Sequence, residues 1–238
     1  MPIAAGGRVG MGGAESTLVT IAAGTEVSAF RRELSSWGRA NRRSFPWRET
    51  DDPFRILVAE VLLQRSRGNT VAKVYQELFR RWPSAAELSR ARVPSIESVI
   101  RPLGLIRRAR TLKELAREVA RIDGVPNTLE GLLALPGVGP YAAGATFVVA
   151  FGRSTAVVDG VTARVYRRYF GLAGSDPAST DRQLWNLVQE ATPTRNARQW
   201  NWAVLDLASI VCVPKIPRCG SCPLATDCRW SQTHRSLS

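Results

Sequence analysis

The sequence predicts an all-α protein, and three kinds of observation support that class. Apolar residues recur at helical spacing, most clearly on the face shared by Val71, Val74, Tyr75, Leu78 and Phe79. Helix-start signals precede apolar stretches: Asp52 and Pro53 offer an N-cap and a first-turn proline, and Ser84 with Glu87 forms a capping box. No stretch alternates convincingly at the period of two that a half-buried strand requires.

The expected helices follow one another through short connections. After an apolar-rich helix over residues 54–66 and a short one opening at residue 84, helical patterns cover residues 71–79, 108–120, 142–151, 161–170, 183–191 and 200–211. Residues 1–25 are rich in Gly, Ala and Ser and lack the basic start and apolar block of a signal peptide. We expect a flexible leader there.

The composition indicates a globular protein with an anionic partner. The 238 residues are 45% hydrophobic and contain no apolar run long enough to span a membrane, so we expect no membrane association. Lysine and arginine number 33 against 20 aspartates and glutamates, which gives a net charge of +13. This surplus favours DNA or RNA as the partner over a basic surface that binds nothing specific.

All four cysteines lie near the C-terminus, in the stretch CVPKIPRCGSCPLATDC, as Cys212, Cys219, Cys222 and Cys228. Two disulfides would suit a secreted protein, although no secretion signal supports them. A zinc site normally shows two close cysteine pairs, whereas only one pair is close here. The longer outer spacings favour an iron–sulfur cluster with four cysteine ligands over zinc.

Glu60 lies inside the nearly continuous apolar run ILVAEVLLQRS. One interpretation places it on the exposed edge of an amphipathic helix. In the other, it faces an active-site cleft from a buried helix, where desolvation would raise its pKa and suit the carboxyl group to proton donation.

A glycine-containing turn, LPGVG, separates a helix ending near residue 134 from one starting near Pro140. Gly137 and Gly139, on either side of Val138, permit backbone conformations and close approaches that other residues do not. The backbone N–H groups at the start of the following helix can hold a phosphate oxygen. Such a hairpin would grip a DNA backbone without reading its sequence.

With these motifs in place, the chain resembles the helix-hairpin-helix DNA glycosylases, the endonuclease III and MutY superfamily. The resemblance rests on the cysteine spacing and on two segments, FPWRETDDPFRILVAEVLLQRS and LPGVGPYAAGATFVVAFGRSTAVVDGVTARVYRRYFGL. It covers nearly everything after the leader. It implies two α-helical lobes with a DNA-binding cleft between them, a helix-hairpin-helix motif, a C-terminal iron–sulfur cluster loop with a [4Fe-4S] cluster, and excision of a flipped-out base.

The resemblance also implies a domain layout and a cellular setting. A glycosylase domain is expected over residues 26–228, with one lobe at about 54–160 and the other at about 26–53 plus 161–211. A cluster loop at 212–228 and a tail at 229–238 would follow. We expect a cytoplasmic, nucleoid-associated monomer whose partner is double-stranded DNA with a mismatched or modified base.

Two carboxyl groups carry the chemistry that the resemblance implies. Asp159 would be the catalytic carboxylate, stabilising the positive charge on the sugar and orienting or deprotonating water. Its place just before a helix also suits a plain N-cap. Glu60 would contact or protonate the leaving base, or hold a water that does so.

Tyr141 indicates which member of the superfamily the chain is similar to. Bifunctional members carry a lysine here that forms a Schiff base with the sugar, which a phenol cannot do, so we expect a monofunctional enzyme. MutY-like adenine glycosylases usually carry serine and continue into a further domain; the sequence ends soon after Cys228, so we expect that domain to be absent. The tyrosine resembles that of archaeal thymine-DNA glycosylases acting on T/G and U/G mismatches. The alternative interpretation is that Tyr141 only packs in the core.

Several residues are expected to bind DNA by family position. Gln64, Leu105 and Ile106 are candidates for filling the gap left by the flipped base, with plain helix surface and core as the alternative. Arg65, with Arg67, Arg107 and Arg108, would contact phosphates or the orphan guanine. Pro140 departs from the family, whose members tend to carry a basic or polar residue there, and this puts local hairpin contacts in doubt.

The predicted substrate is therefore a thymine or uracil mispaired with guanine. One alternative is a different base, either adenine opposite a damaged guanine or a modified cytosine. Another is a non-catalytic DNA-binding module, against which the presence of both Glu60 and Asp159 argues.

Overall fold

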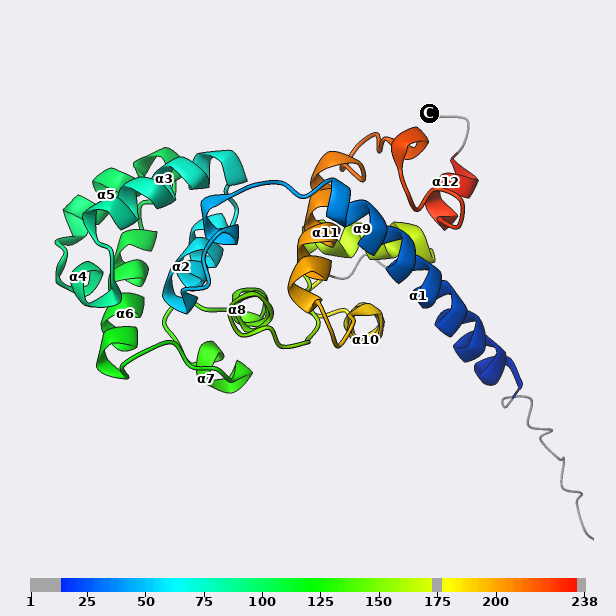
Figure 1. Ribbon diagram of the computed structural model, residues 1–238, viewed down its shortest axis with the longest axis horizontal. Helices are drawn as coiled ribbons and strands as arrows, with labels where there is room; N and C mark the ends of the chain where they lie inside the picture. The colour runs from blue at the N-terminus through cyan, green and yellow to red at the C-terminus, as the bar shows by residue number, and fades with distance from the viewer. Residues whose placement is uncertain (1–13, 173–176, 235–238) are drawn as a thin grey trace, which may run out of the picture.

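The computed structural model describes residues 14–172 and 177–234, and every regular element within them is helical. The predicted all-α class is therefore confirmed. Figure 1 shows the helices divided into two lobes, with α2 to α8 on the left and α1 and α9 to α12 on the right. The segment that joins α1 to α2 crosses from one lobe to the other.

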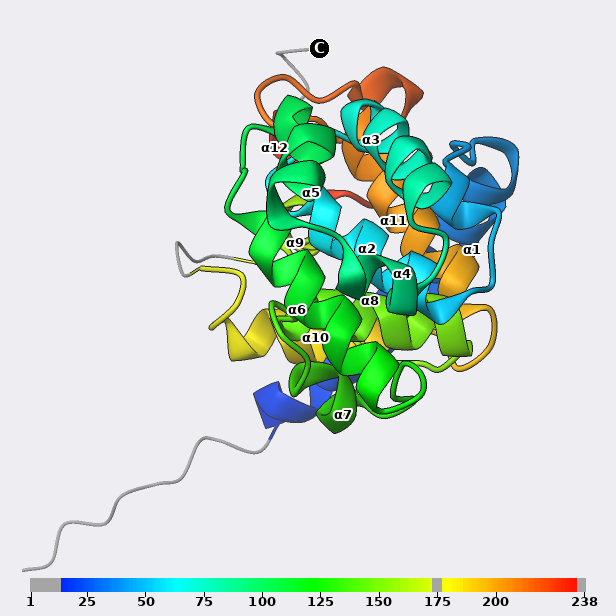
Figure 2. The same cartoon turned by 90° about the vertical axis from the view of Figure 1, so that its left-hand side faces the viewer.

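The first lobe contains seven α-helices around one hydrophobic core. They are α2 (Pro53–Leu63), α3 (Gly68–Arg81), α4 (Ala85–Arg90), α5 (Val93–Ile100), α6 (Arg108–Arg121), α7 (Leu129–Leu133) and α8 (Pro140–Phe151), with the short 3-10 helix η2 (Arg101–Leu103) between α5 and α6. The apolar helix α2 packs against α3, α6 and α8, and Figure 2 shows it enclosed among them. This enclosure buries eight of its eleven residues, Glu60 included.

The second lobe packs its helices around aromatic side chains. Its elements are α1 (Ala14–Ala40), α9 (Gly160–Phe170), α10 (Arg182–Ala191), α11 (Ala197–Ile210), η3 (Cys219–Ser221) and α12 (Arg229–Thr233). The fully buried ring of Phe30 on α1 lies 4.7 Å from that of Tyr169 and 5.5 Å from that of Trp200. These contacts fix α1 against α9 and α11.

The two cores draw on residues across the expected lobe boundaries. Phe45 and Trp47, which lie in the crossing segment, pack into the core of the first lobe. Ala156 and Val158, which precede α9, pack into the core of the second. The lobes therefore interlock where the chain passes between them.

The ends of the chain differ from the expected layout. Helix α1 begins at Ala14, so the second half of the predicted flexible leader belongs to a helix, while residues 1–13 lie outside the described residues. Within the predicted tail, α12 spans Arg229–Thr233. The start of α1 at Ala14 differs from the flexible leader expected over residues 14–25, whereas α12 adds a helix to a tail for which none was predicted or excluded.

The predicted helix starts are found in the structure. Asp52 Oδ1 accepts a hydrogen bond from Phe54 N at 2.8 Å, directly before α2. Ser84 and Glu87 form the expected capping box at the start of α4. These local rules hold because each capping side chain satisfies a backbone N–H that the helix itself leaves unpaired.

A buried ion pair links the crossing segment to α11. The side chains of Arg48, in the 3-10 helix η1 (Pro46–Arg48), and Asp206 are 3% and 1% exposed, and Arg48 Nη1 and Nη2 reach the two carboxylate oxygens of Asp206 at 2.8 and 2.9 Å. Arg43 adds a third contact, from Nε to Asp206 Oδ1 at 2.7 Å. One carboxylate thus holds two arginines of the crossing segment.

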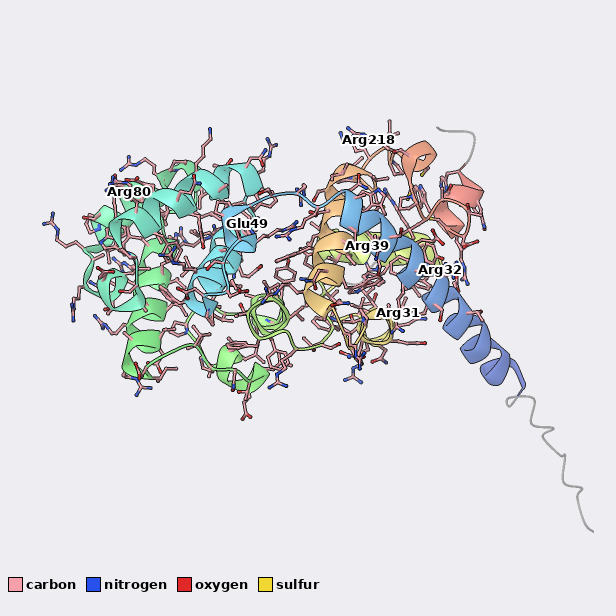
Figure 3. The ribbon with its side chains drawn as sticks, viewed as in Figure 1. Arg31, Arg32, Arg39, Glu49, Arg80 and Arg218 are labelled. Atoms are coloured by element: carbon pink, nitrogen blue, oxygen red, sulfur yellow. The ribbon has the colours of Figure 1, made fainter. Side chains whose placement is uncertain are left out.

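Arginine side chains cover both lobes, as Figure 3 shows for Arg80 on α3, Arg39 on α1 and Arg218 in the cysteine loop. Some of this charge is neutralised locally: Arg80 and Arg81 both pair with Glu77. In the part of the chain that the structure describes, no helix has the length and apolar character needed to cross a membrane.

We expect Asp206→Ala to lower the free energy of unfolding by about 3 to 5 kcal/mol, because it would leave Arg48 buried without a counter-charge. Denaturant unfolding of the two proteins measures the loss. The matched control is Asp51→Ala, which removes an aspartate that pairs with Arg198 at the surface with its side chain 84% exposed, and should cost less than about 1 kcal/mol. Equal, small losses in both variants would contradict the role given to the buried pair.

Candidate active site and DNA-binding surface

A cleft of about 600 Å³ is lined by residues of both lobes and of the segment that joins them. The first lobe contributes Glu60 and Tyr141, and the second contributes Asp159. The other residues that line the cleft include Phe45, Trp47, Arg48, Asn69, Val161 and Trp202. The three residues predicted to take part in catalysis therefore share one cavity, although they are distant in the sequence.

Glu60 faces this cleft from the buried helix α2, as the second interpretation predicted. Its side chain is almost fully enclosed, and Oε2 has no hydrogen-bond partner among the described residues. Burial raises the pKa of Glu60 from its ordinary 4.5 to about 7, with a further rise from nearby Asp159 and a partial offset from Arg48. A carboxyl group with such a pKa is protonated in a substantial fraction of the molecules near neutral pH and can then donate its proton.

Asp159 is the N-cap of α9. Its Oδ1 accepts hydrogen bonds from Val161 N at 2.9 Å and Thr162 N at 2.7 Å, and the Thr162 hydroxyl completes a capping box. The N-terminus of a helix is a favourable place for a negative charge in general. Both interpretations of Asp159 are therefore compatible, since Oδ1 serves the cap and Oδ2 accepts no hydrogen bond from the described residues.

Tyr141 lies in the first turn of α8. Burial, followed by the proximity of Glu60 and Asp159, raises the pKa of its phenol well above the ordinary value of 10. The hydroxyl is therefore neutral and is a hydrogen-bond donor at physiological pH. Among the residues that line the cleft, none is a lysine.

Arg48 and Asp206 are site residues that the sequence reasoning missed. The charge of Arg48 lowers the pKa of both Glu60 and Tyr141. Its guanidinium is held by Asp206 and lies over the ring of Trp202 at 5.2 Å. The available signal was Asp206 itself, a single acid within the apolar stretch WNWAVLDLASI, which is the same pattern that singled out Glu60.

The residues predicted to bind DNA lie in three exposed turns. Gln64 and Arg65 end α2, and Arg65 adopts a left-handed backbone with φ of +56°. Leu105 and Ile106 follow η2 and are 39% and 42% exposed, which is unusual for side chains of this kind. Their exposure argues against the alternative that they are core residues.

The third turn is the hairpin between α7 and α8. Gly137 has φ of +75°, and a Cβ atom there would lie 2.1 Å from Thr111 Cγ2, so only glycine fits. Val138 is buried, and Gly139 is the N-cap of α8 with Pro140 in the first turn, as expected. Gln64 Nε2 donates to the Gly137 carbonyl at 3.4 Å, which joins this turn to the first.

The four cysteines form no disulfide and line one small cavity together with apolar side chains that include Val211, Leu207 and Leu224. Within the described residues, no three His, Cys, Asp or Glu side chains are placed to hold a single metal ion. Burial, with a contribution from the other three thiols, raises the pKa of Cys222 to about 12.

Two arginines of α9 anchor the cysteine loop. Arg164 Nε donates to the Cys212 carbonyl at 2.8 Å, and Arg168 Nη1 donates to the Val213 carbonyl at 2.7 Å. The Arg168 guanidinium also lies 4.8 Å from the ring of Trp230 on α12. Because α9 begins at Asp159, one helix connects the catalytic carboxylate candidate to this loop.

Comparison with known proteins agrees with this geometry. Residues 58–190 match the HhH-GPD superfamily base excision DNA repair protein family. The thymine/uracil-DNA glycosylase of Pyrobaculum aerophilum is 38% identical over 211 residues, which cover 86% of this chain and 92% of that protein. The human adenine DNA glycosylase is 37% identical over 220 residues, but the match covers only 40% of its length.

The fold has close counterparts among solved structures. A thermostable thymine-DNA glycosylase superimposes with a TM-score of 0.83 at 33% identity, covering 88% of this chain and 98% of that one. A trapped endonuclease III–DNA covalent intermediate has a TM-score of 0.78 at 24% identity and supports the fold alone.

The chain belongs to the HhH-GPD superfamily of base excision DNA repair proteins. It is a DNA glycosylase, and DNA is its partner. The positive surplus noted in the sequence fits this assignment, because basic side chains neutralise phosphates when DNA binds.

The raised pKa of Glu60 predicts a pH-dependent stability that Glu60→Gln should remove. Because the folded pKa of about 7 exceeds the ordinary 4.5, the stabilisation is complete below 4.5 and is lost as pH rises through 7. Relative to Glu60→Gln, the free energy of unfolding of the natural protein should fall by about 2 to 3 kcal/mol between about pH 5 and pH 8. The free energy of unfolding of both proteins is measured by denaturant titration at each pH. If the two plots of this free energy against pH run parallel, Glu60 has an ordinary pKa and the prediction is wrong.

Proposed function

We propose that this DNA glycosylase removes thymine or uracil mispaired with guanine, and that it is monofunctional and acts as a monomer. The observation that carries the proposal is the arrangement of Glu60, Asp159 and Tyr141 around one cleft. The relatives and the solved structure named for thymine or thymine and uracil support the choice of base. A mispaired base also costs less to extract than a paired one, which favours such substrates before any pocket contact is made.

The extruded nucleotide would enter the cleft between the lobes. Gly137, Val138 and Gly139 would hold the DNA backbone through the hairpin, while Gln64, Leu105 or Ile106 would occupy the vacated space in the duplex. Arg65, at the same exposed edge, would contact phosphate or the remaining guanine. Aromatic side chains of the lining, such as Phe45 and Trp202, offer flat surfaces against which a base can stack.

Breaking the bond between sugar and base creates positive charge on the sugar and negative charge on the base. Asp159, at the start of α9, would stabilise the sugar cation and orient the water that attacks it. Glu60, kept protonated by burial and by Asp159, would give a proton to the departing base directly or through water. The two carboxyl groups therefore take different roles because their surroundings differ.

The absence of an amine from the cleft lining supports hydrolysis without strand cleavage. A Schiff base requires a nucleophilic amine beside the sugar, and Tyr141 presents a neutral phenol there instead. We therefore propose that the product is an intact strand with an abasic site.

The test is a panel of duplexes, each with one mismatch or modified base, incubated with the purified protein. We expect release of thymine and uracil opposite guanine, with strand breaks only after alkali. Asp159→Asn should slow release about a hundredfold or more while keeping the fold, because asparagine also caps helices. Its control is Asp181→Asn, the N-cap of α10, which does not line the cleft and should leave the rate unchanged.

Other outcomes would replace the proposal. Release of adenine opposite oxidised guanine, or of a modified cytosine, with T/G and U/G untouched, would change the substrate. Tight binding of every duplex with release from none would indicate a non-catalytic module. Strand breaks without alkali would show that some amine performs lyase chemistry.

We further propose that Cys212, Cys219, Cys222 and Cys228 hold a [4Fe-4S] cluster. The four thiols fit such a cluster. They line one apolar cavity without converging on the position of a single metal ion, and a cubane cluster binds each cysteine through a different iron atom. Bound there, the cluster would cross-link the loop, whose backbone Arg164 and Arg168 already tie to α9. Lys215 and Arg218 would then be presented on a rigid surface toward DNA.

Anaerobically purified protein should contain iron and inorganic sulfide in equal amounts and show broad visible absorption. Cys222→Ala should lose both, whereas the neighbouring Ser221→Ala should keep them. Stoichiometric zinc without sulfide in the natural protein would contradict the cluster.

A further inference from the structure

The first turn of α6 is in contact with all three turns assigned to DNA binding. The loop bearing Leu105 and Ile106 runs directly into it: Arg108 N donates to the Leu105 carbonyl at 3.0 Å, and Ala109 N donates to the Ile106 carbonyl at 2.9 Å. The two exposed apolar side chains therefore stand on the rigid start of a helix.

The Arg108 side chain joins this helix to the end of α2. Its Nη1 donates to the Leu62 carbonyl at 2.8 Å and to Ser66 Oγ at 3.2 Å, and Nη2 donates to the Gln64 carbonyl. The last carbonyls of a helix lack partners within it and favour a nearby cation. Arg108 thus caps α2 from a different element.

Thr111, one turn further along α6, contacts the hairpin. Its methyl group occupies the space beside Gly137 in which a Cβ atom would clash. The hydrogen bond from Gln64 to the Gly137 carbonyl joins the turn after α2 to the hairpin. The start of α6 therefore contacts all three turns, and the hydrogen bond from Gln64 also joins two of them directly.

The position of Arg108 has no advantage for α6 itself, because a cation in the first turn is disfavoured by the helix dipole. Its guanidinium is partly buried, and this burial lowers its pKa from the ordinary value. With both terminal nitrogens bonded to the end of α2 and to Ser66, the side chain is poorly placed for the phosphate contact that the sequence suggested. Arg107 and Arg110, by contrast, are exposed.

We propose that Arg108 is a positioning residue for base extrusion, an inference that rests on the proposed function. It would fix the side chains that enter the duplex relative to the hairpin that grips the backbone. It would also fix them relative to Glu60, which lies one turn before Gln64 on α2. Arg108 acts through these neighbours and does not touch the base.

The test compares Arg108→Met, which keeps the apolar stem but removes the donors, with Arg110→Met on the same turn. Single-turnover release of uracil is measured from a U/G duplex and from a single strand, in which no base has to be extruded from a helix. Arg108→Met should slow the duplex reaction about tenfold or more and leave the single-strand rate within about twofold. Arg110→Met should change neither rate by more than about twofold.

Equal slowing on both substrates, or no slowing on the duplex, would overturn the proposal. Arg108→Lys retains a cation that can reach one carbonyl and should recover part of the duplex rate, which a mere folding defect in Arg108→Met would not explain. Unfolding curves of both variants establish that they are folded.

A second measurement separates this inference from the proposed function. In an Asp159→Asn background, 2-aminopurine beside the mismatch reports unstacking by its fluorescence. The signal should fall when Arg108→Met is added and persist with Arg110→Met, whether or not the natural protein releases thymine or uracil. An unchanged signal would contradict the positioning role.

Discussion

The chemistry proposed for this protein depends on two carboxyl groups, Asp159 and Glu60, that line one cleft in different surroundings. Asp159 receives the backbone hydrogen bonds that cap the start of α9. Glu60 is enclosed in the buried helix α2 and lies near Asp159, and both effects raise its pKa to about 7. If Glu60 were fully solvated, it would be ionised at neutral pH and could not act as the proposed acid for the departing base.

The pKa of Glu60 also depends on a third charged group, Arg48. Arg48 lowers the pKa of Glu60, so the raised value reflects burial and Asp159 working against a cation. Arg48 is in turn committed to Asp206 through two hydrogen bonds, which limits how strongly its charge acts on the cleft. The ion pair that secures the crossing segment to α11 therefore also sets the electrostatics of the site.

Much of the fold could be predicted because it follows local rules. Periodicity located α2, α3, α6 and α8 to α11, and the caps at Asp52, Ser84 and Asp159 depend only on residues a few positions away. The pairing of Arg48 with Asp206 and the capping of α2 by Arg108 could not be predicted, because each joins segments that are distant in the sequence. Helix α1 was not among the predicted helices, and its first residues were assigned to the leader because their composition does not distinguish a helix from a loop.

The candidate site divides in the same way. Glu60 was singled out because it is a charge in an apolar run, whereas the roles expected of Tyr141 and Asp159 came from the family resemblance. That they line a common cleft is a property of the tertiary structure. The sequence also suggested a phosphate contact for Arg108, whereas burial and three acceptors assign it to the interior of the DNA-binding surface.

The dual use of Asp159 has an evolutionary consequence. Asparagine starts a helix about as well as aspartate, so under the proposed mechanism one substitution would abolish base release with little penalty in folding. A lineage could thus convert this repair enzyme into a lesion-binding scaffold in one mutational step. Descendants that retain the acid would then do so under selection for catalysis, since helix initiation alone tolerates either residue.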